Sequence, residues 1–96
     1  MRALFIFQEN LRDHEQFEAY RKLVMATLTP FEGKLLVRGG SFTVIEGDWP
    51  FERTVVLEFP SRDKAEGWYT SKAYQDILPL RLNSMTCNAI IVDAVD

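Results

Sequence analysis

Three arginines are the residues of this sequence best suited to chemistry on a small ligand: Arg38, Arg53 and Arg81. Arg38 follows three apolar residues of a predicted strand and precedes two glycines, which would let another group approach closely. A guanidinium in that place can hold a carboxylate or a phosphate through two parallel hydrogen bonds. An ion pair with Glu46 or Glu58 in the same region of sheet would also explain Arg38, so both interpretations stay open.

Aromatic residues at helical spacing precede Arg81, namely Trp68, Tyr69 and Tyr74. Packing into a core is the usual role of such a stripe. Their polar tips also suit an apolar cleft that holds a small molecule through a few polar groups. Arg81 lies near the end of a predicted short helix, where attraction to the helix dipole is a sufficient reason for a cation. We therefore expect a pocket lined by Arg38, Trp68, Tyr74 and Arg81, with core packing and dipole pairing as the alternative.

Other reactive residue types are sparse. One His and one Cys, far apart in the sequence, offer no pair of metal ligands at a recognised spacing, although a carboxylate-only site for a hard cation stays open. His14 adjoins the predicted start of a helix, where the dipole disfavours the imidazolium, and we expect it to be exposed. Cys87 is expected to be a small packed residue. We assign no catalytic residue, metal or cofactor.

Composition limits the class of protein. The chain has 96 residues, 47% of them hydrophobic and 26% charged, which fits a single globular domain over residues 1–96. A net charge of -3 argues against binding to nucleic acid or to an anionic membrane. A single cysteine excludes an intrachain disulfide and suits a reducing cytoplasm, which is the expected location. No stretch approaches the roughly 20 apolar residues of a membrane span.

The elements that must position these residues follow from hydrophobic periodicity and turn residues. Strands are predicted at residues 2–8, 35–38 continuing as 42–45 after a bulge at the glycine pair, 53–59 and 88–95. Helices are predicted from Asp13 to Gly33, from Ser61 onward, and from near Ser71 to Pro79. The order is β-α-β-β-α-β, the arrangement of ferredoxin-like α+β folds with an antiparallel sheet.

The predicted strands are apolar on both faces. In the first strand, Phe5 and Phe7 point one way while Leu4 and Ile6 point the other. About eight such side chains on the second face, at roughly 1.5–3 kcal/mol each, amount to on the order of 10–20 kcal/mol as an upper bound. The two helices of this fold cover only one face. We therefore predict a homodimer that pairs through its sheets; the alternative is that residues 70–85 cover the second face.

Several segments together resemble one known family: residues 33–40, 46–49 and 55–61, with Ala65, Trp68, Tyr69, Ser71, Tyr74, Leu80 and Arg81. The chain is similar over nearly its whole length to the family called domain of unknown function 1330, a branch of the dimeric α/β-barrel superfamily. The resemblance implies ferredoxin-like subunits paired through their sheets as a dimeric α/β barrel. It favours a pocket role for Arg81 and implies no established activity.

Three functions remain open from the sequence. The first is a small-molecule binding protein for an acidic or aromatic metabolite, held between helices and sheet. The second, suggested by superfamily members that are oxygenases, isomerases or decarboxylases, is an enzyme that needs no cofactor. In that enzyme Arg38 or Arg81 would anchor an anion, with Glu58, Glu46 or His14 as candidates for proton transfer. The third is a purely structural dimer.

Overall fold

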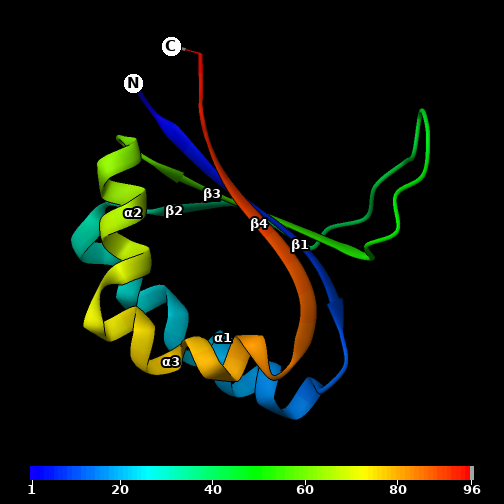
Figure 1. The fold of residues 1–96 in the computed structure, drawn as a ribbon, viewed down its shortest axis with the longest axis horizontal. Coiled ribbons are helices and arrows are strands. Elements are labelled where there is room, and N and C mark those ends of the chain that lie inside the picture. The colour runs from blue at the N-terminus through cyan, green and yellow to red at the C-terminus, as the bar shows by residue number, and fades with distance from the viewer. Residues whose placement is uncertain (96) are drawn as a thin grey trace.

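The computed structural model describes residues 1–95 of the chain. Within them, the strands are β1 (Ala3–Leu11), β2 (Lys34–Arg38), β3 (Arg53–Phe59) and β4 (Met85–Asp93). The helices are α1 (His14–Leu28), α2 (Arg62–Thr70) and α3 (Lys72–Leu82), and a short 3-10 turn, η1 (Thr29–Phe31), follows α1. The strands form one antiparallel sheet in the order β2-β3-β1-β4, with the helices on one side of it (Figure 1). The predicted ferredoxin-like α+β fold is confirmed.

Side-chain caps start the three helices, as the sequence predicts for Asp13 and Ser61. The Asp13 carboxylate accepts hydrogen bonds from the backbone N–H of Gln16 at 3.1 Å and from its side-chain amide at 3.0 Å. The hydroxyls of Ser61 and Ser71 cap α2 and α3 in the same way. Because Ser71 both ends α2 and starts α3, the chain turns sharply there, and α3 packs against α1 (Figure 1).

The core lies between the sheet and the helices. Phe5 and Phe7 of β1 pair with Leu57 and Val55 of β3, and alternate residues of β1 are therefore buried on the helix side. Gly33 lies where α1 and β3 come together, since a Cβ there would be 2.8 Å from both Leu28 and Phe59. The sequence predicted that Gly33 ends the helix. Instead α1 ends at Leu28, and the left-handed residue after η1 is Glu32, with φ 58°.

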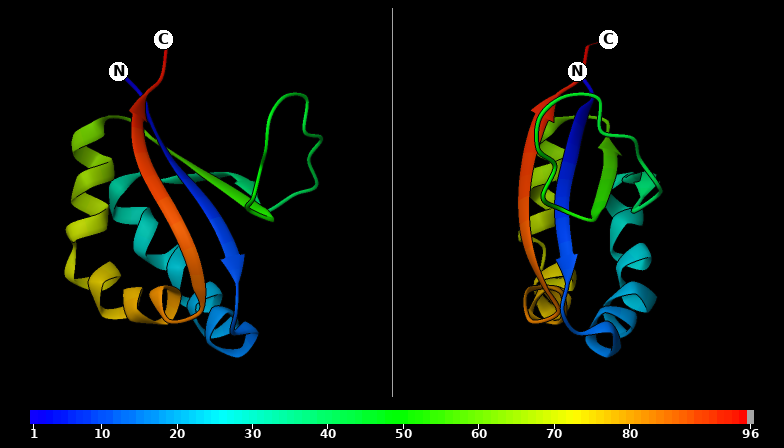
Figure 2. Two further views of the ribbon diagram at one scale, coloured as in Figure 1. Left: turned by 45° about the vertical axis from the view of Figure 1, so that its right-hand side comes forward. Right: turned by 90° about the vertical axis from the view of Figure 1, so that its right-hand side faces the viewer.

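Residues 39–52 correct the predicted second strand. They contain no strand, so the prediction of a strand that resumes at 42–45 is wrong. Gly39 has φ +59° and donates its N–H to the carbonyl of Thr54 at 2.8 Å, which ends β2 and turns the chain off the sheet. The register shift lies earlier, between Leu35 and Val37. Figure 2 shows the resulting loop on the side of the sheet opposite the helices.

Three other predicted boundaries also shift. β1 continues past residue 8 to Leu11, because Glu9 keeps its place in both neighbouring ladders. β4 begins at Met85 and ends at Asp93, earlier than the predicted 88–95. α3 does not stop at Pro79. Pro79 lacks only its own N–H, and its carbonyl still accepts a hydrogen bond from the N–H of Asn83 at 2.9 Å, so the helix runs on to Leu82.

The sheet face away from the helices, here called the outer face, carries a row of aliphatic side chains. Register pairs Val37 with Val56, Val56 with Ile6 and Ile6 with Ile90, so the row crosses all four strands of the sheet. Residues 70–85 lie in α2, α3 and the turn into β4, on the helix side, and the alternative that they cover this face is wrong. No described helix has the length and apolar character needed to cross a membrane.

Candidate functional site

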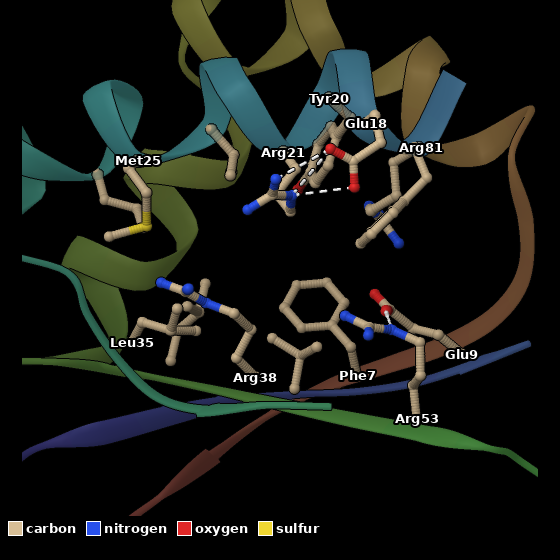
Figure 3. A pocket seen from close by; sticks show the side chains of 15 residues that line it. Phe7, Glu9, Glu18, Tyr20, Arg21, Met25, Leu35, Arg38, Arg53 and Arg81 are labelled. Atoms are coloured by element: carbon tan, nitrogen blue, oxygen red, sulfur yellow. Dashed lines mark hydrogen bonds and ion pairs between the residues drawn. The ribbon is translucent and has the colours of Figure 1, made fainter. Parts of the chain in front are cut away.

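A cleft of about 320 Å³ separates α1 from the sheet, and we call it the α1 cleft (Figure 3). Its walls are apolar on both sides, formed by residues that include Phe7, Phe17, Val24, Leu35, Val55 and Leu57. The size falls at the lower end of the roughly 300–1,000 Å³ that ligand pockets occupy. An apolar wall with a few polar groups is the usual construction of a small-molecule site.

The polar groups of the α1 cleft are mostly cationic. Four arginines and two glutamates line it: Arg21, Arg38, Arg53, Arg81, Glu9 and Glu18. Arg21 pairs with Glu18 at 2.9 Å, and Arg53 Nε pairs with Glu9 Oε1 at 3.3 Å. The other two arginines form no ion pair within residues 1–95. A chain of net charge -3 therefore has a cleft that is locally positive.

Arg81 is the deeper of these two cations, with 2% of its surface exposed. Its Nε donates to the hydroxyl of Tyr74 at 3.0 Å and its Nη1 to the sulfur of Cys87 at 3.1 Å. Its guanidinium carbon lies 5.0 Å from the ring centre of Phe7. The remaining nitrogen, Nη2, donates to no described residue. Because no buried side-chain nitrogen or oxygen of residues 1–95 lacks a partner, Nη2 is not fully buried, and Arg81 is one of the residues that line the cleft.

Arg38 stands at the edge of the cleft, where it is exposed and forms no hydrogen bond or ion pair with the described residues. Figure 3 shows its side chain rising from the end of β2 toward α1. Glu58 is not its partner, because Glu58 belongs to the outer face and receives a hydrogen bond from Arg2 at 3.1 Å. Glu46 forms no ion pair within residues 1–95 either, so the structural explanation for Arg38 is not found there.

The predicted pocket aromatics lie behind the cleft and not along it. Trp68 and Tyr74 are each 0% exposed, and their ring centres are 4.0 Å apart. Tyr74 bridges the core and the cleft, since its hydroxyl meets both Arg81 and, at 2.9 Å, the hydroxyl of Tyr20. Burial raises the pKa of both tyrosines, which keeps the two hydroxyls protonated. Of the predicted residues, the structure thus brings Arg38 and Arg81 to one cleft, with Tyr74 as a support for Arg81.

The indole of Trp68 is anchored by a hydrogen bond from Nε1 to Oγ1 of Thr27 at 2.9 Å. We expect Thr27→Val to lower the free energy of unfolding by about 1–3 kcal/mol, because it leaves a buried indole N–H without an acceptor. The measurement is urea unfolding at one fixed protein concentration, with midpoints compared at equal m values. Thr70→Val is the matched control: its hydroxyl is exposed, and the midpoint should barely move.

Glu9 and Arg53 line the cleft as a hydrogen-bonded pair that the sequence did not predict. Glu9 is 3% exposed, and burial raises the pKa of its carboxyl although Arg53 and Arg81 act against the shift. The sequence did contain a usable pattern, because Ala3, Phe5 and Phe7 alternate and the next residue on that face is Glu9. Because the predicted strand ends at residue 8, it does not include Glu9 in the alternating pattern.

Metal-ligating groups do not gather anywhere in residues 1–95: no three His, Cys, Asp or Glu side chains are placed to share an ion. His14, the sole histidine, is the exposed first residue of α1. The chemistry available in the cleft is therefore that of guanidinium groups, the buried carboxylate of Glu9, the side chain of Tyr20 and an apolar wall.

An antiparallel sheet in the order β2-β3-β1-β4, with helices on one face, defines the ferredoxin-like class of α+β proteins, and here it carries an arginine-rich cleft. Within that class, the chain belongs to the family described as domain of unknown function (DUF1330), which matches residues 2–95. This match confirms the resemblance seen in the sequence. A comparison with curated proteins found no match.

Solved structures share the fold at low sequence identity. A protein of unknown function from Rhodopseudomonas palustris superposes with a TM-score of 0.81 at 14% identity, covering 99% of this chain and 83% of that one. A dimeric ferredoxin-like protein of unknown function from Jannaschia sp. CCS1 gives 0.78 at 5% identity, covering 98% and 100%. SnoaB, a cofactor-independent oxygenase from Streptomyces nogalater, gives 0.66 at 9% identity, covering 99% and 94%. Such likenesses show the fold alone.

Proposed function

We propose that this protein binds a small organic anion with an apolar body in the α1 cleft. The observation that carries the proposal is the pair Arg38 and Arg81, two guanidinium groups that form no ion pair within residues 1–95 and lie beside an apolar wall. A buried cation without a counter-ion is costly, and an anionic ligand would offset that cost. The carboxylate would meet Arg81 Nη2 and Arg38, and the apolar body would lie between α1 and the sheet.

Calorimetric titration with phenylacetate, compared with its neutral isostere phenylacetamide, tests the proposal. Phenylacetate should bind, and phenylacetamide should bind at least tenfold more weakly because a charge-assisted hydrogen bond is lost. Arg38→Gln should weaken phenylacetate binding roughly threefold to tenfold, since the group is exposed and contributes about 0.5–1.5 kcal/mol. Arg62→Gln is the matched control, because Arg62 pairs with Asp93 outside the cleft. Equal affinity for acid and amide would contradict the proposal.

We also propose that the chain works as a homodimer joined through the outer faces of two sheets. The support is the aliphatic row on that face, where Ile90 is 57% exposed, together with the dimeric proteins that share the fold. The loop at residues 39–52 adds further apolar surface on the same side, since Phe42 and Trp49 are each about half exposed and lie 6.4 Å apart between ring centres. A second copy would cover both surfaces.

The cytoplasm remains the location we propose, on the ground of the single free cysteine. An enzymatic role is the second candidate function. It is favoured by one specific observation, the buried carboxylate of Glu9 inside the same cleft as Arg38 and Arg81. Neither Glu58, on the outer face, nor His14, at the start of α1, occupies that cleft.

A further inference from the structure

We propose that Glu9 is the general base of a proton-transfer reaction at carbon, carried out in the α1 cleft on 2-oxo carboxylates that have an acidic C–H beside the carbonyl. The inference rests on two buried side chains of one cleft, Glu9 and Arg81. Among the described residues, Oε2 of Glu9 accepts no hydrogen bond and Nη2 of Arg81 donates none. The inference rests on the proposed anion site and assigns it a substrate class.

The geometry of Glu9 leaves one oxygen available. Its Oε1 accepts a single hydrogen bond, from Arg53 Nε at 3.3 Å. The other oxygen, Oε2, accepts none from the described residues, and it is therefore not fully buried, because no buried side-chain oxygen lacks a partner. Glu9 lines the cleft, and Figure 3 shows its carboxylate directed into it. Oε2 is thus placed to receive a proton from a bound ligand.

The surroundings also make Glu9 a stronger base than an exposed glutamate. Removal from water raises the pKa of its carboxyl, and the single long hydrogen bond with Arg53 and the charges of Arg53 and Arg81 only partly offset the burial. The guanidinium of Arg53 is committed elsewhere as well: it lies 4.9 Å from the ring centre of Phe17 and packs against Gly39. A general base works best when its pKa approaches the working pH. The burial of Glu9 raises its pKa, and the long hydrogen bond with Arg53 lowers that pKa by less.

Arg81 supplies the complementary charge. When a C–H next to a carbonyl is deprotonated, negative charge develops on the carbonyl oxygen. A guanidinium whose Nε and Nη1 are fixed by Tyr74 and Cys87 is held rigidly, with Nη2 left to face that oxygen or the neighbouring carboxylate. Burial strengthens such an interaction, because less water screens it. Arg38 would then hold the remaining carboxylate oxygen at the mouth of the cleft.

The step balances without another reactant. The C–H bond breaks and its proton goes to Oε2 of Glu9. The electron pair of that bond forms the new C=C bond, and the carbonyl π pair moves to oxygen, which gives an enolate. Glu9 then returns the proton to the enolate, at the same carbon or at oxygen. Nothing is oxidised or reduced. In deuterated water the protonated carboxyl of Glu9 exchanges its proton for deuterium, which it then returns to the carbon.

Phenylpyruvate is a suitable probe, because it combines a carboxylate, a 2-oxo group, an acidic CH2 and an aromatic ring. The assay follows the loss of the CH2 proton signal by NMR in deuterated buffer, measured as the rate above buffer alone, while calorimetry measures binding of the same compound. Glu9→Gln is expected to lower the protein-dependent exchange rate at least 100-fold, as loss of a general base does. It should not weaken binding, since it removes a negative charge from an anion site. Glu9→Asp, with a shorter side chain, should exchange at least tenfold more slowly and still bind.

Glu58→Gln is the matched control, with the same change on the outer face of the same sheet. It should leave the exchange rate unchanged. The proposal is overturned if the protein binds phenylpyruvate without exchange, or if both Glu9 variants exchange at the original rate; in either case the anion site itself stands. Absence of phenylpyruvate binding would overturn this step too, and it would remove the proposed function only if phenylacetate also failed to bind.

Discussion

Arg81→Met is expected to weaken phenylacetate binding roughly 30-fold to 150-fold, the largest loss that any single change in the α1 cleft should cause. The reason is burial. Arg81 is 2% exposed, so its hydrogen bond to a carboxylate forms where little water competes, and such a bond contributes about 2–3 kcal/mol. Methionine is unbranched and apolar, and it can occupy the space beside Phe7 without a charge. The affinity is measured by calorimetric titration, as for Arg38→Gln.

The same variant should keep its fold. Removing Arg81 frees the hydroxyl of Tyr74 from one donor, but that oxygen keeps its hydrogen bond with Tyr20. It also removes a buried positive charge, whose desolvation is unfavourable in the free protein. We therefore expect the melting temperature to stay within a few degrees of the original. Unchanged affinity for phenylacetate in a folded Arg81→Met protein would place the anion site elsewhere.

Most of the fold could be predicted because its determinants are local. Asp13 and Ser61 cap helices through their own side chains, and 53–59 is a strand between clear turn residues. Alternation along β1 and β3 set the two faces of the sheet. The loop at 39–52 was missed for the opposite reason. An apolar segment joins a sheet only if its backbone can pair with a neighbouring strand. Gly39 turns the chain away from β3, so residues 42–45 do not continue the pairing.

The candidate site was predicted in part. Arg38 and Arg81 could be selected from their sequence context, because Arg38 follows apolar strand residues and precedes two glycines, and Arg81 lies near the end of a helix. Trp68 and Tyr74 could not be placed, since core and pocket aromatics share the same helical spacing and differ only in what covers them. Glu9 is the next residue on the buried face of Ala3, Phe5 and Phe7, so its place on that face could have been predicted. Its hydrogen bond could not, because Arg53, which donates to Oε1, is 44 positions away in the chain.

Val56→Asp is expected to convert the protein from a dimer to a folded monomer. Val56 stands inside the aliphatic row of the outer face, with Val37 on one side and Ile6 on the other. In a two-fold interface each substitution occurs twice, so pairing would bury two like charges, at several kcal/mol each. In the monomer the carboxylate faces water, and the cost is limited to the strand preference, about 1 kcal/mol.

Light scattering after size exclusion, at about 20 micromolar, provides the measurement: the original chain should have twice the 11.1 kDa of one subunit, and Val56→Asp should have that of one subunit. Asn83→Asp is the control, because it adds the same charge at the end of α3, away from the outer face. If the original chain has the mass of one subunit at about 20 micromolar, the dimer is refuted. Because the α1 cleft is on the other side of the sheet, the monomeric variant should still bind phenylacetate; that result would separate pairing from ligand binding and assign them to opposite faces of one sheet.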